Sequence, residues 1–351
     1  MYKAREQTEI LSELQEQSAI EASHIEGTFE HDVLSSNSLE FAKAEVELEQ
    51  MIKVAFADTS WGEYLTMRAE EMGVVRKPAV RAIGTVTVSG TVGAEIPEGT
   101  IFSTESDIYF ETSTAAEIGE NGTAVVPVQA QIAGSSGNVA AGTVIKIPMS
   151  VPGVNQVTNA SATYDGYDEE TDDSLLARYL LHVRTPGTSG NPSHYREWAL
   201  SVPGVGDCQV LSLWAGNGTV KVYVVDVNKD AASAELMQRV YDYIESVRPI
   251  GATVTIDTPS YMAINVSARV KVNANYDEDY ENILKAAISE YLDASGFDRD
   301  YVSIAQIGKV MLNSGAIYDY EALKLNDDIQ NVPITSGYLP RLGTLEVTVD
   351  E

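Results

Sequence analysis

One cysteine and four histidines among 351 residues leave this chain few of the side chains that form disulfides or bind metals. The single thiol, Cys208, cannot make an intramolecular disulfide or a cysteine-based zinc cluster, which suits synthesis in a reducing cytoplasm. It lies in a predicted strand, so we expect a small buried apolar residue. His24, His31, His182 and His194 form no His-Glu-x-x-His motif. The sequence therefore predicts neither a metal site nor a cofactor.

Basic residues are also scarce, because 23 Lys and Arg face 52 Asp and Glu, giving a formal net charge of -29. Such a field repels phosphate backbones and anionic lipids, which disfavours binding to nucleic acid. It fits a protein that stays soluble at high local concentration until it meets specific partners, although an acidic source proteome is an alternative. No apolar run approaches the ~20 residues of a membrane span. The first ten residues lack the apolar core of a signal peptide, so we expect a soluble protein outside the usual secretory route.

Motifs of catalysis are missing too. Ser193 and His194 are sequence neighbours, but no Gly-x-Ser-x-Gly elbow accompanies them. The glycine-rich segments 134–137 and 216–218 lack a following Gly-Lys-Ser/Thr and are typical of turns. The acidic segment 165–173 lacks the spacing of a calcium loop, and a solvated linker that leads into a helix explains it better. We expect no enzyme, although paired carboxylates for glycoside hydrolysis stay open in so acidic a chain.

Residues 184–259 carry the clearest order of elements. Asn191 can cap a helix that starts at Pro192, and Pro203-Gly204 ends it. The pattern then predicts strands over 208–214 and 219–225 joined by a tight hairpin, a helix from 233 to 248, and a strand over 253–256. This alternation is typical of a small α+β module.

The flanking regions differ in pattern. Residues 1–76 are predicted helical, with a polar loop over 18–37 and a capping box at Ser60. Short strands over 78–162 predict a small antiparallel sandwich or barrel, with Pro127 and Pro148 at edges or strand ends. Thr171 can cap a further helix. From 261 on, the pattern predicts a strand over 262–273, helices over 277–292 and 303–313, and strands over 316–325 and 345–349. The helix–strand–strand order of elements after residue 303 is the same as the order after residue 192.

The fold class that follows is α+β multidomain: N-terminal helices, a small antiparallel β sandwich or barrel domain, then two α+β modules. We place the boundaries as follows: 1–76, an N-terminal helical partner-binding segment; 77–163, a β-rich domain; 164–260, an α+β middle module; 261–351, an α+β C-terminal module. The helices of the first segment have only a narrow apolar stripe and no second layer of their own. Helices with such a stripe usually pack on the rest of their own chain and less often await a partner. If they await one, as the resemblance described below implies, Phe41, Leu48, Ile52, Trp61 and Tyr64 are the candidate partner-interface residues.

The order of turn residues resembles the baseplate J family of contractile phage tails, phage-tail-like bacteriocins and related contractile injection systems. The matching elements are Arg184, Gly187, Gly190, the Tyr195 to Val205 helix with its Pro-Gly stop, the Gly-rich hairpin, Arg248-Pro249-Ile250-Gly251, and upstream Gly99 to Phe102, Tyr109 to Thr112 and the 134–139 turn. They extend over about three quarters of the chain. Each is common alone, and their combination carries the resemblance.

The resemblance implies a structural wedge protein. Members assemble with other wedge and hub proteins into a sixfold ring around the tail hub, often with a second copy in each wedge, and the ring's rearrangement frees the sheath to contract. It implies N-terminal helices in a bundle with neighbouring subunits, contact between copies through the last module, and assembly in the bacterial host cytoplasm before incorporation into the baseplate of the released particle. The alternatives are a glycan-binding or glycan-degrading surface protein and an assembly chaperone absent from mature particles.

Overall fold

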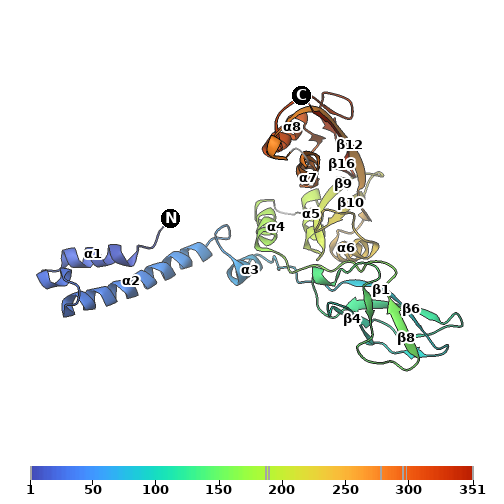
Figure 1. Ribbon diagram of the computed structural model, residues 1–351, viewed down its shortest axis with the longest axis horizontal. Coiled ribbons are helices and arrows are strands. Elements are labelled where there is room, and N and C mark those ends of the chain that lie inside the picture. The colour runs from blue at the N-terminus through green and yellow to red at the C-terminus, as the bar shows by residue number, and fades with distance from the viewer. Residues whose placement is uncertain are drawn as a thin grey trace. The chain divides into compact units, whose positions relative to one another are not determined.

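The computed structural model describes residues 2–185, 188, 190–276, 279–294, 296–297 and 299–349. The chain divides into two compact units. The first joins residues 1–76 to 170–183, and the second joins residues 77–169 to 184–351. Figure 1 shows helices alone in the first unit and mixed helices and strands in the second. The predicted α+β multidomain class is confirmed.

The first unit contains four helices. They are α1 (Gln7–Gln17), α2 (Phe29–Val54), α3 (Gly62–Glu70) and α4 (Asp172–Arg184), with a 3-10 turn over Glu21–His24. α1 lies alongside α2 (Figure 1). The predicted loop over 18–37 is wrong in its second half, because α2 begins at Phe29. The Thr28 side chain accepts the His31 N–H there, and acidic residues in the first turn favour the helix N-terminus.

The capping box predicted at Ser60 is also absent. Trp61 occupies the N-cap of α3 and makes no side-chain cap. The Gly62 N–H instead donates to the Asp172 carboxylate at 2.8 Å, so the first residue of α4 caps α3. As predicted, the helix is followed by Gly73, whose positive φ of 80° closes the turn. Leu65 and Ala69 of α3 pack with Leu175 of α4 in the unit's core. α4 itself starts as predicted, with Thr171 capping it.

The β-rich part of the second unit is a nearly closed antiparallel sheet in the order β7-β3-β4-β6-β1-β8. Its strands are β1 (Ile83–Gly90), β3 (Ile101–Thr104), β4 (Tyr109–Thr112), β6 (Thr123–Ala130), β7 (Val144–Lys146) and β8 (Val154–Thr158), with β2 (Glu95–Ile96) paired to β5 (Ala116–Glu117). Buried Asn159 joins the two edges, because its side-chain oxygen accepts the Val144 N–H at 2.9 Å and its amide donates to Ala140 O. The predicted barrel-like domain is therefore present.

Pro127 departs from its predicted place at an edge or strand end, since it lies inside β6, between β4 and β1. Its carbonyl accepts the Ser113 N–H, so its nitrogen faces the same side, where β4 has already ended at Thr112. The missing donor therefore costs no ladder bond. Pro148 follows the end of edge strand β7, as predicted.

The middle module has a three-stranded sheet in the order β11-β10-β9. Its elements are α5 (Pro192–Ser201), β9 (Val205–Ser212), β10 (Thr219–Asp226), α6 (Ala234–Val247) and β11 (Thr253–Asp257). Asn191 caps α5 and Ser233 caps α6, as the sequence predicts. β9 and β10 form the predicted antiparallel hairpin, and β11 joins β10 in parallel. β9 starts before the predicted 208 and ends at Ser212, because Leu213 has a positive φ of 57°.

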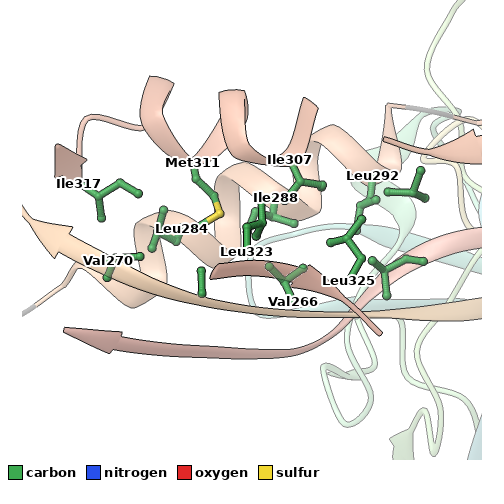
Figure 2. Close-up of a cluster of buried hydrophobic side chains, with 13 residues drawn as sticks. Val266, Val270, Leu284, Ile288, Leu292, Ile307, Met311, Ile317, Leu323 and Leu325 are labelled. Atoms are coloured by element: carbon green, nitrogen blue, oxygen red, sulfur yellow. The ribbon is translucent and has the colours of Figure 1, made fainter. Parts of the chain in front are cut away.

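The C-terminal module has the sheet order β14-β12-β16. Its elements are β12 (Ser260–Val272), α7 (Tyr280–Asp293), α8 (Ile304–Asn313), β14 (Ile317–Leu325) and β16 (Tyr338–Val349), with β13 (Tyr301–Val302) paired to β15 (Val332–Pro333). Figure 2 shows Leu284, Ile288, Ile307 and Met311 of α7 and α8 directed toward Val266, Val270, Leu323 and Leu325 of the sheet. Asp277, where the helix was predicted to begin, lies outside the described residues.

The echo between the two modules is one of order only. In the middle module β9 and β10 are hydrogen-bonded neighbours. In the C-terminal module β12 lies between β14 and β16, which flank it as antiparallel and parallel partners. Both sheets have a central strand with one antiparallel and one parallel partner, but the two strands that follow the helix are neighbours in the middle module and are separated by β12 in the C-terminal module.

Candidate interaction surfaces

α2 presents two rows of side chains with the alternating spacing of three and four residues that coiled coils use. One row, here the α1 row, is mostly polar and partly or fully buried: His31, Ser35, Ser38, Ala42, Glu45 and Glu49. The other, here the open seam, is mostly apolar: Leu34, Asn37, Phe41, Ala44, Leu48, Met51 and Ala55. All of the open seam except half-buried Leu34 is exposed, with Phe41 at 54%, Leu48 at 50% and Met51 at 65%.

Polar contacts hold the segment before α1 against the α1 row. The Arg5 side chain pairs with Glu45, its Nε lying 3.0 Å from Oε1, and the Ala4 N–H donates to Glu49 at 2.7 Å. Hydrogen bonds from Arg5 lower the pKa of Glu45 to about 2. Ile10 is buried in the same helix pair. The helix therefore meets its own neighbour through charged groups and leaves its apolar row uncovered within the first unit.

A groove of about 360 Å³ runs between α1 and α2. Phe41 and Leu48 line its α2 side, and Ile10 and Leu14 line its α1 side, with Arg5, Glu13 and Glu45 around them. The structure thus brings together two of the five predicted interface residues. Ile52, the third, is half-buried one turn beyond Leu48. Met51 belongs to the same exposed row but is not among the five predicted residues. The α1 side chains that line the groove were not predicted, because no sequence signal places α1 beside this face of α2.

The other predicted pair, Trp61 and Tyr64, lies at the start of α3. Their rings meet edge to face, with centroids 6.0 Å apart. Both are exposed, at 40% and 50%, whereas Leu65, the residue after Tyr64, is buried in the core of the unit. Arg76 fixes the helix beneath them, because its guanidinium donates to Asp172 at 2.6 Å and to Thr66 at 2.8 Å. The pair is therefore an exposed aromatic platform on a rigid base.

The acidic segment 165–173 is not the solvated linker predicted. In the second unit, buried Asp165 accepts from the Tyr167 and Ser233 hydroxyls, and Asp168 accepts from the Ser135 backbone and side chain. In the first unit, buried Glu170 forms a two-pronged ion pair with Arg178, both bonds at 2.7 Å. These carboxylates tie backbone segments together, which sequence spacing alone could not reveal.

The groups considered for catalysis or ligand binding have ordinary surroundings. The centroids of the His194 and Trp198 rings lie 4.0 Å apart, with the ring planes tilted by 36°, and His194 Nδ1 accepts the Gly190 N–H. Trp198 is buried, at 9% exposed, so the three tryptophans cannot form a common sugar platform. Among the described residues, no three His, Cys, Asp or Glu side chains gather as a metal site requires. In the ranges that the structure describes, no helix is both long and apolar enough to cross a bilayer.

Three family models match successive parts of the chain. They are the Baseplate J-like protein barrel domain at residues 85–166, the Baseplate J-like central domain at 187–258 and the Baseplate J-like protein C-terminal domain at 264–348. The first match coincides with the barrel-like sheet, and the other two with the two α+β modules. Gly187, at the start of the central match, lies outside the described residues.

Similar proteins extend over the same length. The uncharacterized protein YqbT of Bacillus subtilis (strain 168) is 31% identical over 332 residues, covering 92% of this chain and 91% of YqbT. The phage-like element PBSX protein XkdT of the same organism is 29% identical over 330 residues, covering 92% and 91%. The baseplate protein gp47 of Escherichia phage Mu is 29% identical over 206 residues, covering 55% of this chain and 57% of gp47.

Among solved structures, a chain of the anti-feeding prophage baseplate aligns with a TM-score of 0.48 and 14% identity, covering 96% of this chain and 90% of that one. The family models and the full-length relatives confirm the resemblance predicted from the order of turns, strands and helices. This chain belongs to the baseplate J-like family.

Proposed function

We propose that this protein is a structural wedge component of the baseplate of a contractile tail or injection system. It assembles with other wedge and hub proteins into a sixfold ring around the hub, with a second copy in each wedge. The ring's rearrangement then triggers sheath contraction. Family membership supports this proposal, as does the relative from phage Mu, which is named a baseplate protein. We place the protein in the host cytoplasm during assembly and in the baseplate of the released particle afterwards.

The observation that carries the proposal is the open seam of α2. A helix of 26 residues spans ~39 Å, yet the apolar row along it is exposed beside a groove with Phe41 and Leu48 on its wall. An exposed row with three-four spacing is suited to a helix from another subunit. Phe41, Leu48, Ile52, Trp61 and Tyr64 are therefore proposed as interface residues, with Met51 added.

The proposed division of labour follows the four parts of the chain. Residues 1–76 bind partners, 77–163 form the β-rich domain, 164–260 the middle module, and 261–351 the module that contacts a second copy. The proposed role is mechanical and not enzymatic, since interfaces that exchange partners need no reacting group. The glycan-active alternative receives less support, because Trp198 is buried and cannot contribute to a sugar-binding face. Turnover of cell-wall glycan that is lost on one carboxylate-to-amide change would favour that alternative.

The test uses the double variant Phe41→Ser/Leu48→Ser in producing cells. Its control is Leu39→Ser/Val46→Ser, which has the same spacing and similar exposure on another face of α2. Mass spectrometry of purified particles should find the unmodified chain and the control at constant ratio to sheath and tube, and should find the seam variant depleted at least about tenfold. The seam is excluded as an interface if both variants are incorporated equally. If the unmodified chain stays in the lysate, the wedge proposal fails and the chaperone alternative gains.

A further inference from the structure

Two turns of the second unit carry the same three residues, Asn-Gly-Thr. One is Asn121-Gly122-Thr123, where β6 begins, and the other is Asn217-Gly218-Thr219, where β10 begins. No other asparagine of the chain is followed by glycine. An asparagine before glycine is especially prone to lose its side-chain amide, because glycine has no side chain to shield its own backbone nitrogen. The two turns therefore offer the same reacting groups in different surroundings.

Loss of the amide is an internal displacement. Base removes the proton of the glycine N–H, and the nitrogen attacks Cγ of the asparagine to form a new C–N bond, which closes an imide ring. The Cγ–Nδ2 bond breaks, and ammonia leaves after taking a proton from water. Water then opens the imide at either carbonyl, which gives aspartate or isoaspartate. The reaction therefore needs a glycine N–H that is free to lose its proton, in a peptide unit that can turn about its flanking single bonds.

Hydrogen bonds restrain the reacting groups in the first turn. The Gly122 N–H donates to Gly119 O at 2.9 Å. Asn121 Oδ1 accepts the Thr123 N–H at 3.1 Å. The Gly122 carbonyl also accepts the Gly90 N–H at 3.1 Å, which ties the turn to the end of β1. Attack on Asn121 requires the first two bonds to break, so we expect slow conversion there although its side chain is exposed.

The second turn leaves the same groups free. In the part of the chain that the structure describes, neither the Gly218 N–H nor the Asn217 side chain has a hydrogen-bond partner, and both residues are exposed. The loop is fixed on either side of them. Thr219 Oγ1 donates to Gly216 O at 2.7 Å, and Gly218 O accepts the Thr253 N–H at 2.7 Å. The Asn217–Gly218 peptide unit is thus an unbonded link in a held loop, and turning it breaks no hydrogen bond of its own.

We propose that Asn217 is a site of spontaneous deamidation in the folded protein, where it becomes aspartate or isoaspartate while Asn121 stays intact. This modification is independent of the proposed baseplate role. Conversion adds a negative charge to the loop, and isoaspartate also lengthens its backbone. Leu213 and Trp214 are 60% and 46% exposed in the same loop. The charge and shape of this apolar surface therefore change as the protein ages.

Peptide mapping by mass spectrometry tests the proposal on the full chain, kept at mildly alkaline pH and sampled over time. Electron-transfer fragmentation separates isoaspartate from aspartate. In the native protein, Asn217 should convert at least about tenfold faster than Asn121, because only Asn121 has to wait for local opening. In guanidinium, where neither turn persists, the two rates should agree within about threefold. Because both sites have the sequence Asn-Gly-Thr, each is the control for the other.

Two single variants assign the change in charge. Ion-exchange chromatography of the aged native protein should resolve a more acidic species. Asn217→Gln should remove most of that species, since glutamine has to close a larger ring that forms more slowly. Asn121→Gln should leave it unchanged. The proposal is overturned if the native protein converts the two asparagines at equal rates, if Asn121 converts faster, or if Asn217→Gln leaves the acidic species in place.

Discussion

At the residue scale, buried charged side chains in the second unit bind backbone groups and so fix the positions of neighbouring segments. Lys77 is buried and its Nζ donates to Leu200 O and Val205 O, at 3.3 and 2.9 Å, which closes the C-terminal end of α5. Buried Asp207 pairs with Arg196 at 2.9 Å and accepts the Cys208 N–H. Each charge is offset by partners at close range, which a buried charge requires.

Cys208 should be chemically silent in the native protein. Burial raises the pKa of its thiol to about 12, so the reactive thiolate is scarce at pH 8. We expect a colorimetric disulfide reagent at pH 8 to label one thiol per chain in guanidinium and, at least about a hundredfold more slowly, in buffer. Labelling in buffer at the denatured rate would show that β9 is open. Ser212→Cys, exposed at the end of the same strand, supplies the fast control.

Residues whose partners are local were predictable from the sequence. Asn191 and Ser233 cap helices within three residues, and the burial of Cys208 followed from its strand. The contacts of Asp165 and Glu170 could not be predicted. The sequence shows that both residues are acidic, but it does not show that Ser233 and Arg178 donate to them in the folded chain.

At the scale of elements, α2 differs from an ordinary amphipathic helix. A surface helix normally turns its apolar side to its own core. α2 instead meets α1 through the α1 row, with Glu45 and Glu49 as acceptors, and leaves the open seam exposed. Hydrogen bonds and an ion pair from the segment before α1, together with buried Ile10 of α1, hold the helix pair without covering the apolar row.

The pairing of α1 with α2 should weaken at low pH. The folded pKa of Glu45, about 2, lies below its ordinary 4.5, because Arg5 stabilises the carboxylate. The contribution of Glu45 is therefore complete above about pH 4.5 and is lost as pH falls toward 2. Hydrogen exchange of α1 amides, corrected for intrinsic rates, should accelerate over that interval. Glu45→Gln should show faster exchange already at pH 6, whereas exposed Glu47→Gln should not. Equal protection in Glu45→Gln would mean that the ion pair does not hold α1.

Elements were predicted well where their start signals lie in the neighbouring sequence, and less well elsewhere. The start of α2 was misplaced because Thr28 was overlooked as a cap within a polar stretch. α3 lacks a local cap, and its capping carboxylate, Asp172, follows 110 residues later in the chain. The narrow apolar stripe of α2 in the sequence suggests that this row is exposed. Which residues belong to the open seam and which to the α1 row can be decided only once the position of α1 is known.

At the scale of the whole molecule, polar contacts join modules within the second unit. Arg341 of β16 donates to Lys229 O at 2.7 Å and to Asp230 at 2.9 Å, and it also pairs with Asp293 of α7. The Gly337 N–H donates to Gln209 of β9 at 2.8 Å. The apolar cluster in Figure 2 draws on residues of the C-terminal module alone. The middle and C-terminal modules thus have separate cores linked by directional bonds.

Arg341→Met should lower the free energy of unfolding by about 1–2 kcal/mol, because the partly buried guanidinium serves three acceptors and the methionine keeps its apolar stem. Arg269→Met, which removes an exposed pair with Glu321 on the same sheet, should cost about 0.5 kcal/mol or less. Urea unfolding followed by far-ultraviolet circular dichroism measures both. Similar losses in the two variants would contradict a linking role for Arg341.

The family and the succession of modules could be recognised from the sequence because turn residues mark each junction. The composition of the first unit could not, since Leu175 of α4 completes a core begun by Leu65 and Ala69 of α3. No pattern within either segment signals the other.

Because the core of the first unit is built from two separate segments of the chain, it limits where recombination between related genes can join them. A single crossover near residue 76 would separate α3 from α4, leaving Leu65 without Leu175 and Gly62 without the Asp172 carboxylate. The helical unit can be inherited intact only by a double crossover that carries residues 170–183 with it. Chimaeras built with one junction should therefore aggregate, while those built with two should fold.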